Sequence, residues 1–241
     1  PKRGHEVIYP AGTSGYGITN RYMATVIYGD GNHKVRIPSN LSVIGTMNTS
    51  DQNVFTLDTA FQRRWNMRLI ENTFENVRPS LANAKILDTD VTWETFCTTI
   101  NKLVVGNRAK MASAEDKRLG VYFVHESDLE FDDRAISPDN DLRGEYNVLL
   151  KAERNGNLTP EQKGRLYDIR EALKKIRKFP EKVIKYLWDD AFKFNPEALF
   201  DTDNMESLEQ VIRTFVYSTG RDRFKIFKPT VRSTFYPDSQ A

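Results

Sequence analysis

The sequence predicts an α/β segment over residues 1–72, followed by an all-helical domain over residues 73–241. A short apolar run at residues 41–47 is followed by helical spacing and then by a second apolar alternation at residues 65–69. Strand, helix and strand in this order are typical of a parallel α/β core. After residue 73 apolar residues instead recur three and four positions apart, which indicates amphipathic helices.

The composition is that of a soluble globular protein. Of 241 residues, 39% are hydrophobic and 28% are charged, which argues against a disordered chain. The formal net charge of +2 argues against a protein that coats nucleic acid over its whole surface, although it permits a local basic face. The single Cys97 excludes an internal disulfide framework and a cysteine-rich zinc site.

Neither an apolar run long enough to span a membrane nor a signal-peptide pattern occurs in the sequence. We therefore expect a cytoplasmic protein with no membrane partner. Because the chain begins with Pro1 rather than Met, we expect it to be a piece of a longer protein with further machinery upstream.

The first 72 residues contain the predicted strands. Residues 1–20 are rich in Gly and Pro and are expected to form a loop. Residues 24–28 are β-prone, residues 29–32 form a turn signal, and residues 33–37 alternate, which predicts a hairpin. The run at residues 41–47 fits a strand that is buried on both faces.

Four amphipathic helices are predicted in the second part. Their apolar positions are Trp93, Phe96, Ile100 and Leu103; Leu166, Ile169, Leu173 and Ile176; Val183, Ile184, Leu187 and Trp188; and Leu208, Val211, Ile212 and Phe215. Thr92 is a candidate N-cap, residues 159–162 form a capping box, and Gly220 is the expected end of the last helix. Residues 126–141 carry seven acids and one base, which predicts an exposed insertion.

The most informative stretch is residues 44–52 together with residues 57–65. A buried strand there ends in a polar cluster, at the edge where open α/β sheets bind ligands. The amide of Asn48 can orient a water molecule without adding charge beside a polyphosphate. A short helix then ends in Arg63 and Arg64, which suit phosphate oxygens. From the residues alone, the alternative is a turn followed by solvated helix-end charges.

This stretch resembles the sensor-1 strand and arginine-finger helix of AAA+ NTPases of the McrB type, in the dynein-related branch. Their pattern of Gly-Thr-Met-Asn-Thr, a small residue and Asp-Arg is matched by residues 45–51, with Gln52 in place of Arg. The Leu-Asp pair of the family is matched by residues 57–58. Its basic pair followed by an aromatic residue is matched by residues 63–65. The hairpin is similar to the pre-sensor hairpin, and residues 116–123 and 179–190 resemble segments of the helical lid.

The resemblance implies a partial AAA+ core in residues 1–72, consisting of the hairpin, the sensor-1 strand and the last core strand. Residues 73–241 would be the helical lid domain, with an acidic insertion at about 126–165 and a basic, aromatic C-terminal tail. The resemblance to the family is strong over residues 38–71 and fainter over residues 92–125 and 179–217.

The resemblance also implies site residues. The implied catalytic residues are Asn48, Arg63 and Arg64. Asn48 would position the attacking water or sense the γ-phosphate, and the arginines would act on the nucleotide of a neighbouring subunit. The nucleotide-binding set is Thr49, Asp51 and Arg118. No metal ligand is assigned.

The phosphate loop of such enzymes is missing, because residues 12–17 lack the required Lys, and no strand ending in Asp-Glu precedes the hairpin. We therefore expect ATP or GTP with Mg²⁺ to bind only in the intact parent, and this piece to be inactive alone. The implied parent is a homo-oligomeric ring of a modification-dependent restriction system, with a McrC-type endonuclease partner and DNA bound through other domains or subunits. The alternative is a non-catalytic oligomerisation or DNA-binding module derived from such a motor.

Other chemistry is less favoured. Asp139 lies in an acidic loop and Glu161 in the first turn of a helix, which argues against a metal-nuclease site. The three histidines are scattered, and Cys97 is predicted to be a buried, inert thiol. Basic residues concentrate in residues 165–185 and 213–232. The tail, with aromatic residues interleaved, either docks on nucleic acid or combines a solvated helix face with an arm that packs on a neighbouring subunit.

Overall fold

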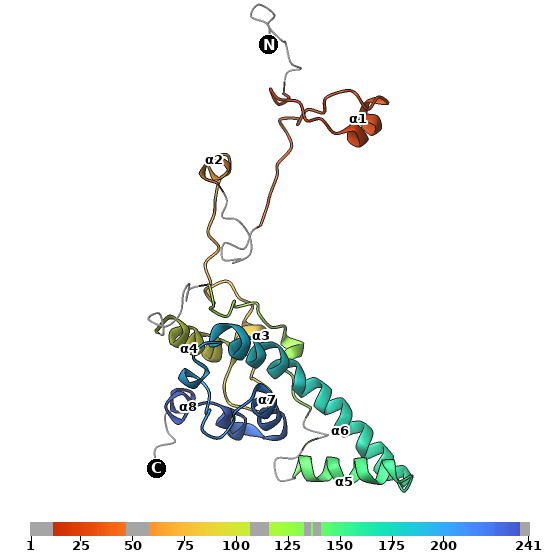
Figure 1. The fold of residues 1–241 in the computed structure, drawn as a ribbon, viewed down its shortest axis with the longest axis vertical. Helices are drawn as coiled ribbons and strands as arrows, with labels where there is room; N and C mark the ends of the chain where they lie inside the picture. The colour runs from red at the N-terminus through yellow and green to blue at the C-terminus, as the bar shows by residue number, and fades with distance from the viewer. Residues whose placement is uncertain (1–11, 47–57, 107–115, 133–135, 137–140, 237–241) are drawn as a thin grey trace, which may run out of the picture. The chain divides into compact units, whose positions relative to one another are not determined.

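The computed structural model describes residues 12–46, 58–106, 116–132, 136 and 141–236 (Figure 1). The chain divides into two compact units, Pro1–Thr56 and Leu57–Ala241. No helix in the described residues is both long and apolar enough to cross a membrane.

In the described residues of the first unit, helix α1 (Arg21–Tyr28) lies where the sequence predicted a strand over residues 24–28. That prediction was wrong because the helix is capped at both ends. The Asn20 side chain accepts a hydrogen bond from the N–H of Met23 at 3.0 Å, and Gly29 closes the helix at φ 73° with its N–H bonded to Thr25 O. These local caps outweigh the β-propensity of a short β-branched run.

The predicted turn at residues 29–32 is confirmed, since the N–H of Asn32 donates to the Asp30 carboxylate at 3.0 Å. The chain that follows does not pair with residues 24–28, however. It returns instead to the loop before α1, where Ile18 and Val35 exchange both backbone hydrogen bonds at 2.7 and 3.0 Å.

The two predicted core strands are not formed in the described parts of the chain. Residues 41–46 are extended without a pairing partner among the described residues, and Ile44 is 92% exposed. Residues 65–69 are likewise unpaired, and Leu69 is 84% exposed. Apolar runs of this kind become buried parallel strands only where neighbouring strands and covering helices are present. The helix predicted between them is observed as α2 (Thr59–Gln62).

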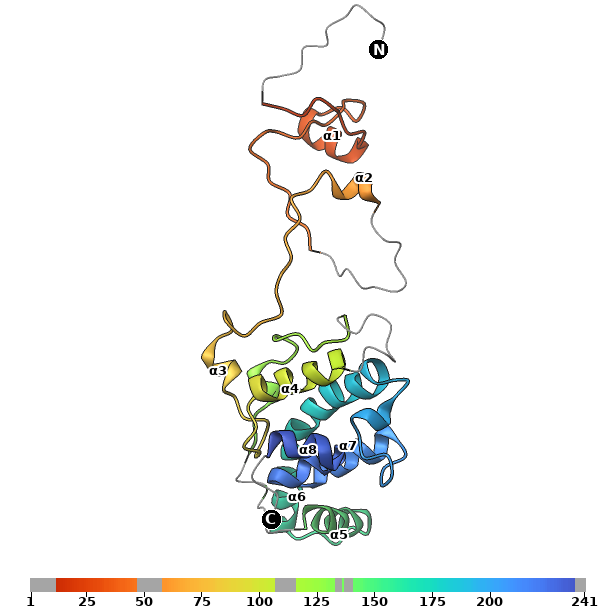
Figure 2. The ribbon, with the colours of Figure 1, turned by 90° about the vertical axis from the view of Figure 1, so that its left-hand side faces the viewer.

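The second unit is helical. Besides α2, the α-helices in its described residues are α3 (Pro79–Ala82), α4 (Trp93–Gly106), α5 (Leu142–Arg154), α6 (Pro160–Phe179), α7 (Leu208–Tyr217) and α8 (Pro229–Phe235). Shorter 3₁₀ or π turns are η2 (Glu126–Asp128), η3 (Pro180–Ile184), η4 (Leu187–Ala191), η5 (Pro196–Ala198) and η6 (Gly220–Ile226). The C-terminal part of α6 lies among α4, α7 and α8, whereas its N-terminal part extends away beside α5 (Figures 1 and 2).

Three of the four helices predicted in this unit are observed as α4, α6 and α7, whereas the one predicted at residues 183–188 is a continuation of α6 through the π turns η3 and η4. Thr92 caps α4 through its hydroxyl, which accepts from the N–H of Thr95 at 3.2 Å. Thr159 and Gln162 form the capping box of α6 with bonds of 3.0 and 3.2 Å. The last predicted helix, α7, ends at Tyr217 rather than at Gly220. Gly220, at φ 51°, instead begins η6.

Aromatic side chains from four elements form the centre of the core. Phe96 of α4 lies 5.5 Å from Phe179 of α6, 5.8 Å from Phe224 of η6 and 5.6 Å from Phe235 of α8, between ring centroids. Phe224 is fully buried, and Phe235 and Tyr236 are each 7% exposed. The tail aromatics therefore pack on the chain's own core. Of the two alternatives for the tail, a nucleic-acid surface with these rings exposed between the basic residues is not what the structure shows.

The acidic segment is not simply an exposed insertion. Leu129, Ile136 and Leu142 within or next to it are each 2% exposed and belong to the main hydrophobic cluster. Its carboxylates pair with the basic run that the sequence shows separately: Asp128 with Lys182 at 2.9 Å and Asp132 with Lys175 at 3.1 Å. Two carboxylates of the acidic segment are therefore ion-paired with two lysines of the basic run.

Candidate functional site

The predicted catalytic residues fall partly outside the described residues. Asn48, Thr49 and Asp51 lie in the stretch that the structure does not describe. Arg63 and Arg64 follow α2 directly, and both are exposed. Neither guanidinium forms a salt bridge with a carboxylate among the described residues, which leaves their positive charge accessible to an anion.

The helix before the arginine pair is short but locally specified. The Asp58 carboxylate accepts from the N–H of Ala60 at 3.1 Å and so caps the first turn of α2. After the turn, the rings of Phe61 and Trp65 lie 5.8 Å apart, between centroids, on either side of the arginine pair. This ring contact restrains the backbone from which Arg63 and Arg64 project.

Arg118 lies on a loop whose neighbouring residues are held firmly. The Lys117 ammonium forms a salt bridge with Asp190, and the Tyr186 hydroxyl donates to the backbone oxygen of Lys117 at 3.2 Å. On the other side, Leu119 is fully buried. The Arg118 side chain itself is exposed. The chain is thus fixed on both sides of a cation that faces solvent.

Two asparagine side chains supply most of the loop's hydrogen bonds. Asn101, on α4, accepts from the N–H of Leu119 at 2.7 Å and donates to the Leu119 oxygen at 2.9 Å. Asn72 donates to the same oxygen at 2.8 Å and accepts from the N–H of Val121 at 3.0 Å. These carboxamides satisfy backbone groups that a neighbouring strand would otherwise satisfy.

Two buried side chains complete this support. The Trp93 indole N–H donates to the backbone oxygen of Val121 at 2.7 Å, and the Cys97 thiol lies 3.5 Å from the Leu119 oxygen. Burial raises the pKa of Cys97 to about 12, so the thiol stays protonated at neutral pH and is not a nucleophile. The prediction that Cys97 is buried is confirmed.

We did not identify Asn72 and Asn101 as functional candidates from the sequence. Asn72 lies in a coil, where an asparagine is ordinarily a turn residue. Asn101 carried a usable signal, because it follows Cys97 by one helical turn on a half-buried face. A polar side chain in that position requires a hydrogen-bond partner, although the sequence does not show which one.

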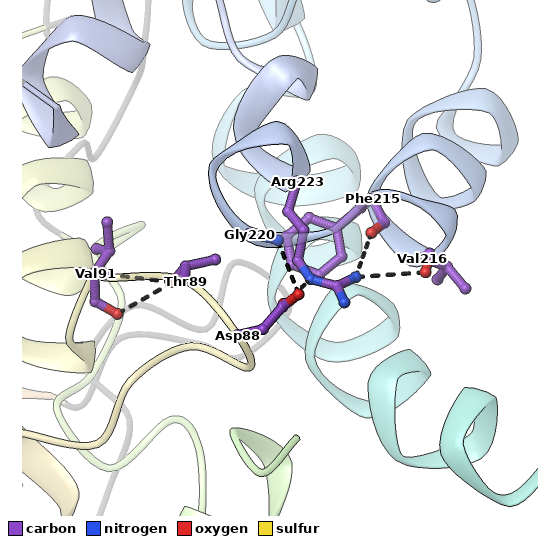
Figure 3. Close-up of polar contacts among 7 residues, drawn as sticks. All are labelled: Asp88, Thr89, Val91, Phe215, Val216, Gly220 and Arg223. Atoms are coloured by element: carbon purple, nitrogen blue, oxygen red, sulfur yellow. Dashed lines mark hydrogen bonds and ion pairs between the residues drawn. The ribbon is translucent and has the colours of Figure 1, made fainter. Parts of the chain in front are cut away.

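A buried ion pair lies elsewhere in the helical unit (Figure 3). Asp88 accepts from the Arg223 Nε and from the N–H of Gly220, the latter at 2.8 Å. Arg223 is fully buried and donates through Nη1 to the Phe215 oxygen at 2.8 Å. Burial lowers the pKa of Arg223, while Asp88 opposes that shift; a guanidinium nevertheless remains charged. This pair fastens η6 to the turn before α4.

The residues considered for metal chemistry do not gather. In the part of the chain that the structure describes, no group of three His, Cys, Asp or Glu side chains is placed to hold a metal ion. Glu161 is exposed in the first turn of α6, as predicted, and Asp139 lies outside the described residues. The described carboxylates therefore offer no assembled nuclease site.

Comparison with known proteins finds a relationship over part of the chain. The type II restriction enzyme BsuMI component YdiS of Bacillus subtilis (strain 168) is 37% identical over 101 residues, which cover 39% of this chain and 27% of that protein. The chain thus spans little more than a quarter of the relative that it matches. No family profile and no solved structure match the chain. Over this stretch, the chain is related to a component of a restriction enzyme.

Proposed function

We propose that this chain is the C-terminal portion of an AAA+ motor subunit that hydrolyses ATP or GTP in a McrBC-like, modification-dependent restriction system. The relationship to a restriction-enzyme component supports the restriction system. The motif in residues 44–65 supports the motor. The observation that carries the motor role is the exposed pair Arg63–Arg64 at the end of a capped helix, without a salt bridge to a described carboxylate.

In this proposal Arg63, Arg64 and Arg118 contact phosphate oxygens, and the arginine pair reaches the nucleotide of the adjacent subunit in a ring. Asn48 positions the attacking water, while Thr49 and Asp51 complete the nucleotide contacts. Exposed guanidinium groups can donate paired hydrogen bonds to phosphate oxygens, so these three arginines are suitable contacts for the polyphosphate of a nucleotide. In this proposal Mg²⁺ is held by carboxylates elsewhere in the intact protein.

The size of the expected effect separates this role from a purely structural one. A trans-acting arginine is worth about 10³–10⁵ in rate in well-studied NTPases. A solvated helix-end arginine contributes less than about 1 kcal/mol through an exposed ion pair. Removing the pair therefore has either a very large or a very small consequence for hydrolysis.

The test uses the full-length protein with both Arg63→Ala and Arg64→Ala. We expect nucleotide binding to remain and hydrolysis to be lost. Mixing this variant with a subunit defective only in its phosphate loop should restore part of the activity, because each subunit then supplies what the other lacks. The matched control is Arg143→Ala with Arg154→Ala, two exposed arginines of α5, which should leave hydrolysis unchanged.

Two outcomes would contradict the proposal. Hydrolysis that stays within severalfold after loss of both arginines would assign them to a solvated helix end. Mixed rings that remain inactive would remove the trans role. A full-length sequence without a phosphate loop and an Asp-Glu strand would favour the non-catalytic oligomerisation or DNA-binding module instead.

A further inference from the structure

A groove of about 570 Å³ lies between η6 and α8, remote in sequence from the arginines assigned to nucleotide contacts. Arg221 and Lys225 line it from η6, and Thr230, Arg232 and Tyr236 line it from α8 and its end. The proposed function uses none of these side chains.

The groove carries more positive than negative charge. Its lining includes three cations and one carboxylate, Asp222, which pairs with Lys225 at 2.8 Å. Arg221 approaches Asp90 only to 3.7 Å, and both side chains are well exposed. Arg232 forms no salt bridge with a carboxylate in the described part of the chain. Exposed pairs of this kind are weak and exchange readily with a solvent anion.

The two elements that line the groove are joined by packed aromatic rings. The rings of Phe224 and Phe235 lie 5.1 Å apart and those of Phe224 and Phe227 lie 5.5 Å apart, between centroids. Arg221 lies over the Tyr236 ring, 4.9 Å from its centroid. Because these rings are buried, they present no face on which bases can stack, and the exposed cations are the groups of the groove that suit an anionic ligand.

We propose that this groove binds the phosphate backbone of single-stranded DNA. A chain of phosphates matches several cations spread along one concave surface, whereas a duplex is a convex cylinder that would reach only the rim. Recognition through phosphates alone gives binding with little sequence preference. Binding of DNA in this groove requires no nucleotide and no assembly of subunits into a ring. The proposal therefore goes beyond the proposed function and is independent of it.

Fluorescence anisotropy of a labelled oligothymidylate tests the proposal with the 241-residue chain, in the absence of nucleotide and Mg²⁺. Three cations in contact with phosphates predict a slope of about −2 for the logarithm of the association constant against the logarithm of the salt concentration. A fourfold rise in salt should then weaken binding by about 16-fold. Duplex DNA of the same length should bind more weakly than the single strand.

The groove variant combines Arg221→Ala, Lys225→Ala and Arg232→Ala. The control variant combines Arg143→Ala, Lys151→Ala and Arg154→Ala, which removes the same charge from the exposed surface of α5. We expect the groove variant to bind at least tenfold more weakly with a slope near zero, and the control to stay within twofold of wild type. Lys225→Glu, at a side chain that is 55% exposed, provides a variant with little risk to folding and should also weaken binding.

The proposal is overturned if wild type fails to bind the strand at low salt, or if the groove and control variants lose affinity equally. Duplex that binds as tightly as the single strand would overturn the assignment of the ligand. Because hydrolysis is not measured, these results do not depend on whether Arg63 and Arg64 act as proposed.

Discussion

Asn101 pairs with both backbone polar groups of Leu119, accepting from its N–H at 2.7 Å and donating to its oxygen at 2.9 Å. A neighbouring β-strand offers an extended residue this same combination of donor and acceptor. Here a side chain from α4 takes that place, and the loop before and after Arg118 is thereby tied to the helical core. The carboxamide is the chemical group that satisfies both positions, since it carries a donor and an acceptor side by side.

Asn101→Asp should destabilise the chain. The change keeps the acceptor for the Leu119 N–H, but it removes the donor and brings a negative charge close to the Leu119 oxygen. The Leu119 oxygen keeps its hydrogen bond from Asn72 at 2.8 Å, but a carboxylate oxygen now faces it with no proton to share. Losing one hydrogen bond in this way costs roughly 1–3 kcal/mol, which urea unfolding of the 241-residue chain measures. Asn147→Asp, at an exposed position on α5, is the control and should leave the midpoint almost unchanged. Equal shifts for the two variants would contradict the role assigned to Asn101.

Asn72→Ala should loosen the loop locally. The N–H of Val121 loses its acceptor at 3.0 Å, while Asn101 still holds Leu119. Hydrogen exchange followed by mass spectrometry should show faster exchange in peptides that contain Val121 and little change in α6. Asn76→Ala is the control, because only the backbone oxygen of Asn76 contacts the loop, accepting from the Tyr122 hydroxyl at 3.2 Å. Unchanged exchange at Val121 would show that other contacts suffice to hold the loop.

Asp88→Ala should be far more damaging than Asp90→Ala. The first change leaves the guanidinium of Arg223, which is fully buried, without its carboxylate, and breaking such a pair costs about 3–5 kcal/mol. Asp90 is 65% exposed and its nearest cations lie at 3.5 and 3.7 Å, so its loss should cost well under about 1 kcal/mol. Denaturant unfolding of both variants makes the comparison. Similar costs would mean that the Asp88–Arg223 pair contributes little to the stability of the helical unit.

The helices could be predicted because their signals are local. The capping box at Thr159 and Gln162 and the apolar spacing that follows it lie within a few residues of one another. The same principle explains the error at residues 24–28, where Asn20 and Gly29 cap a helix across a stretch whose β-branched residues favour a strand. Caps outside the stretch carried more information than the residues within it.

The remaining features depend on partners distant in sequence. Residues 41–47 have the composition of a buried strand, but burial requires neighbouring strands that the described residues do not supply. Arg223 lies in a run of basic residues, and the sequence does not reveal that Asp88 is its partner. The hydrogen bonds from the side chains of Asn72 and Asn101 to the backbone of Leu119 likewise join three segments that are separate in the sequence. Their geometry emerges only when the helical unit is folded.

The Cys97 thiol should be unreactive in the folded chain and should make stability fall at high pH. Burial raises its pKa from 9.0 to about 12, so the native state keeps the proton after the unfolded state has released it. The native state therefore binds more protons than the unfolded state between about pH 9 and 12, and the linkage relation makes the free energy of unfolding decrease as pH rises through this window. The slope from this one group approaches about 1.4 kcal/mol per pH unit.

Two measurements check this prediction. A thiol-specific chromogenic reagent at mildly alkaline pH should detect no thiol in the native chain and one thiol after denaturation, because Cys97 is the single cysteine. Cys97→Ala should reduce the alkaline loss of stability relative to wild type, and the two curves should run parallel below about pH 9, where the thiol is protonated in both states. Rapid labelling of the native chain, or curves that stay parallel up to strongly alkaline pH, would show that the thiol beneath the Leu119 oxygen is open to solvent. The loop that carries Arg118 would then be held less firmly than its hydrogen bonds indicate.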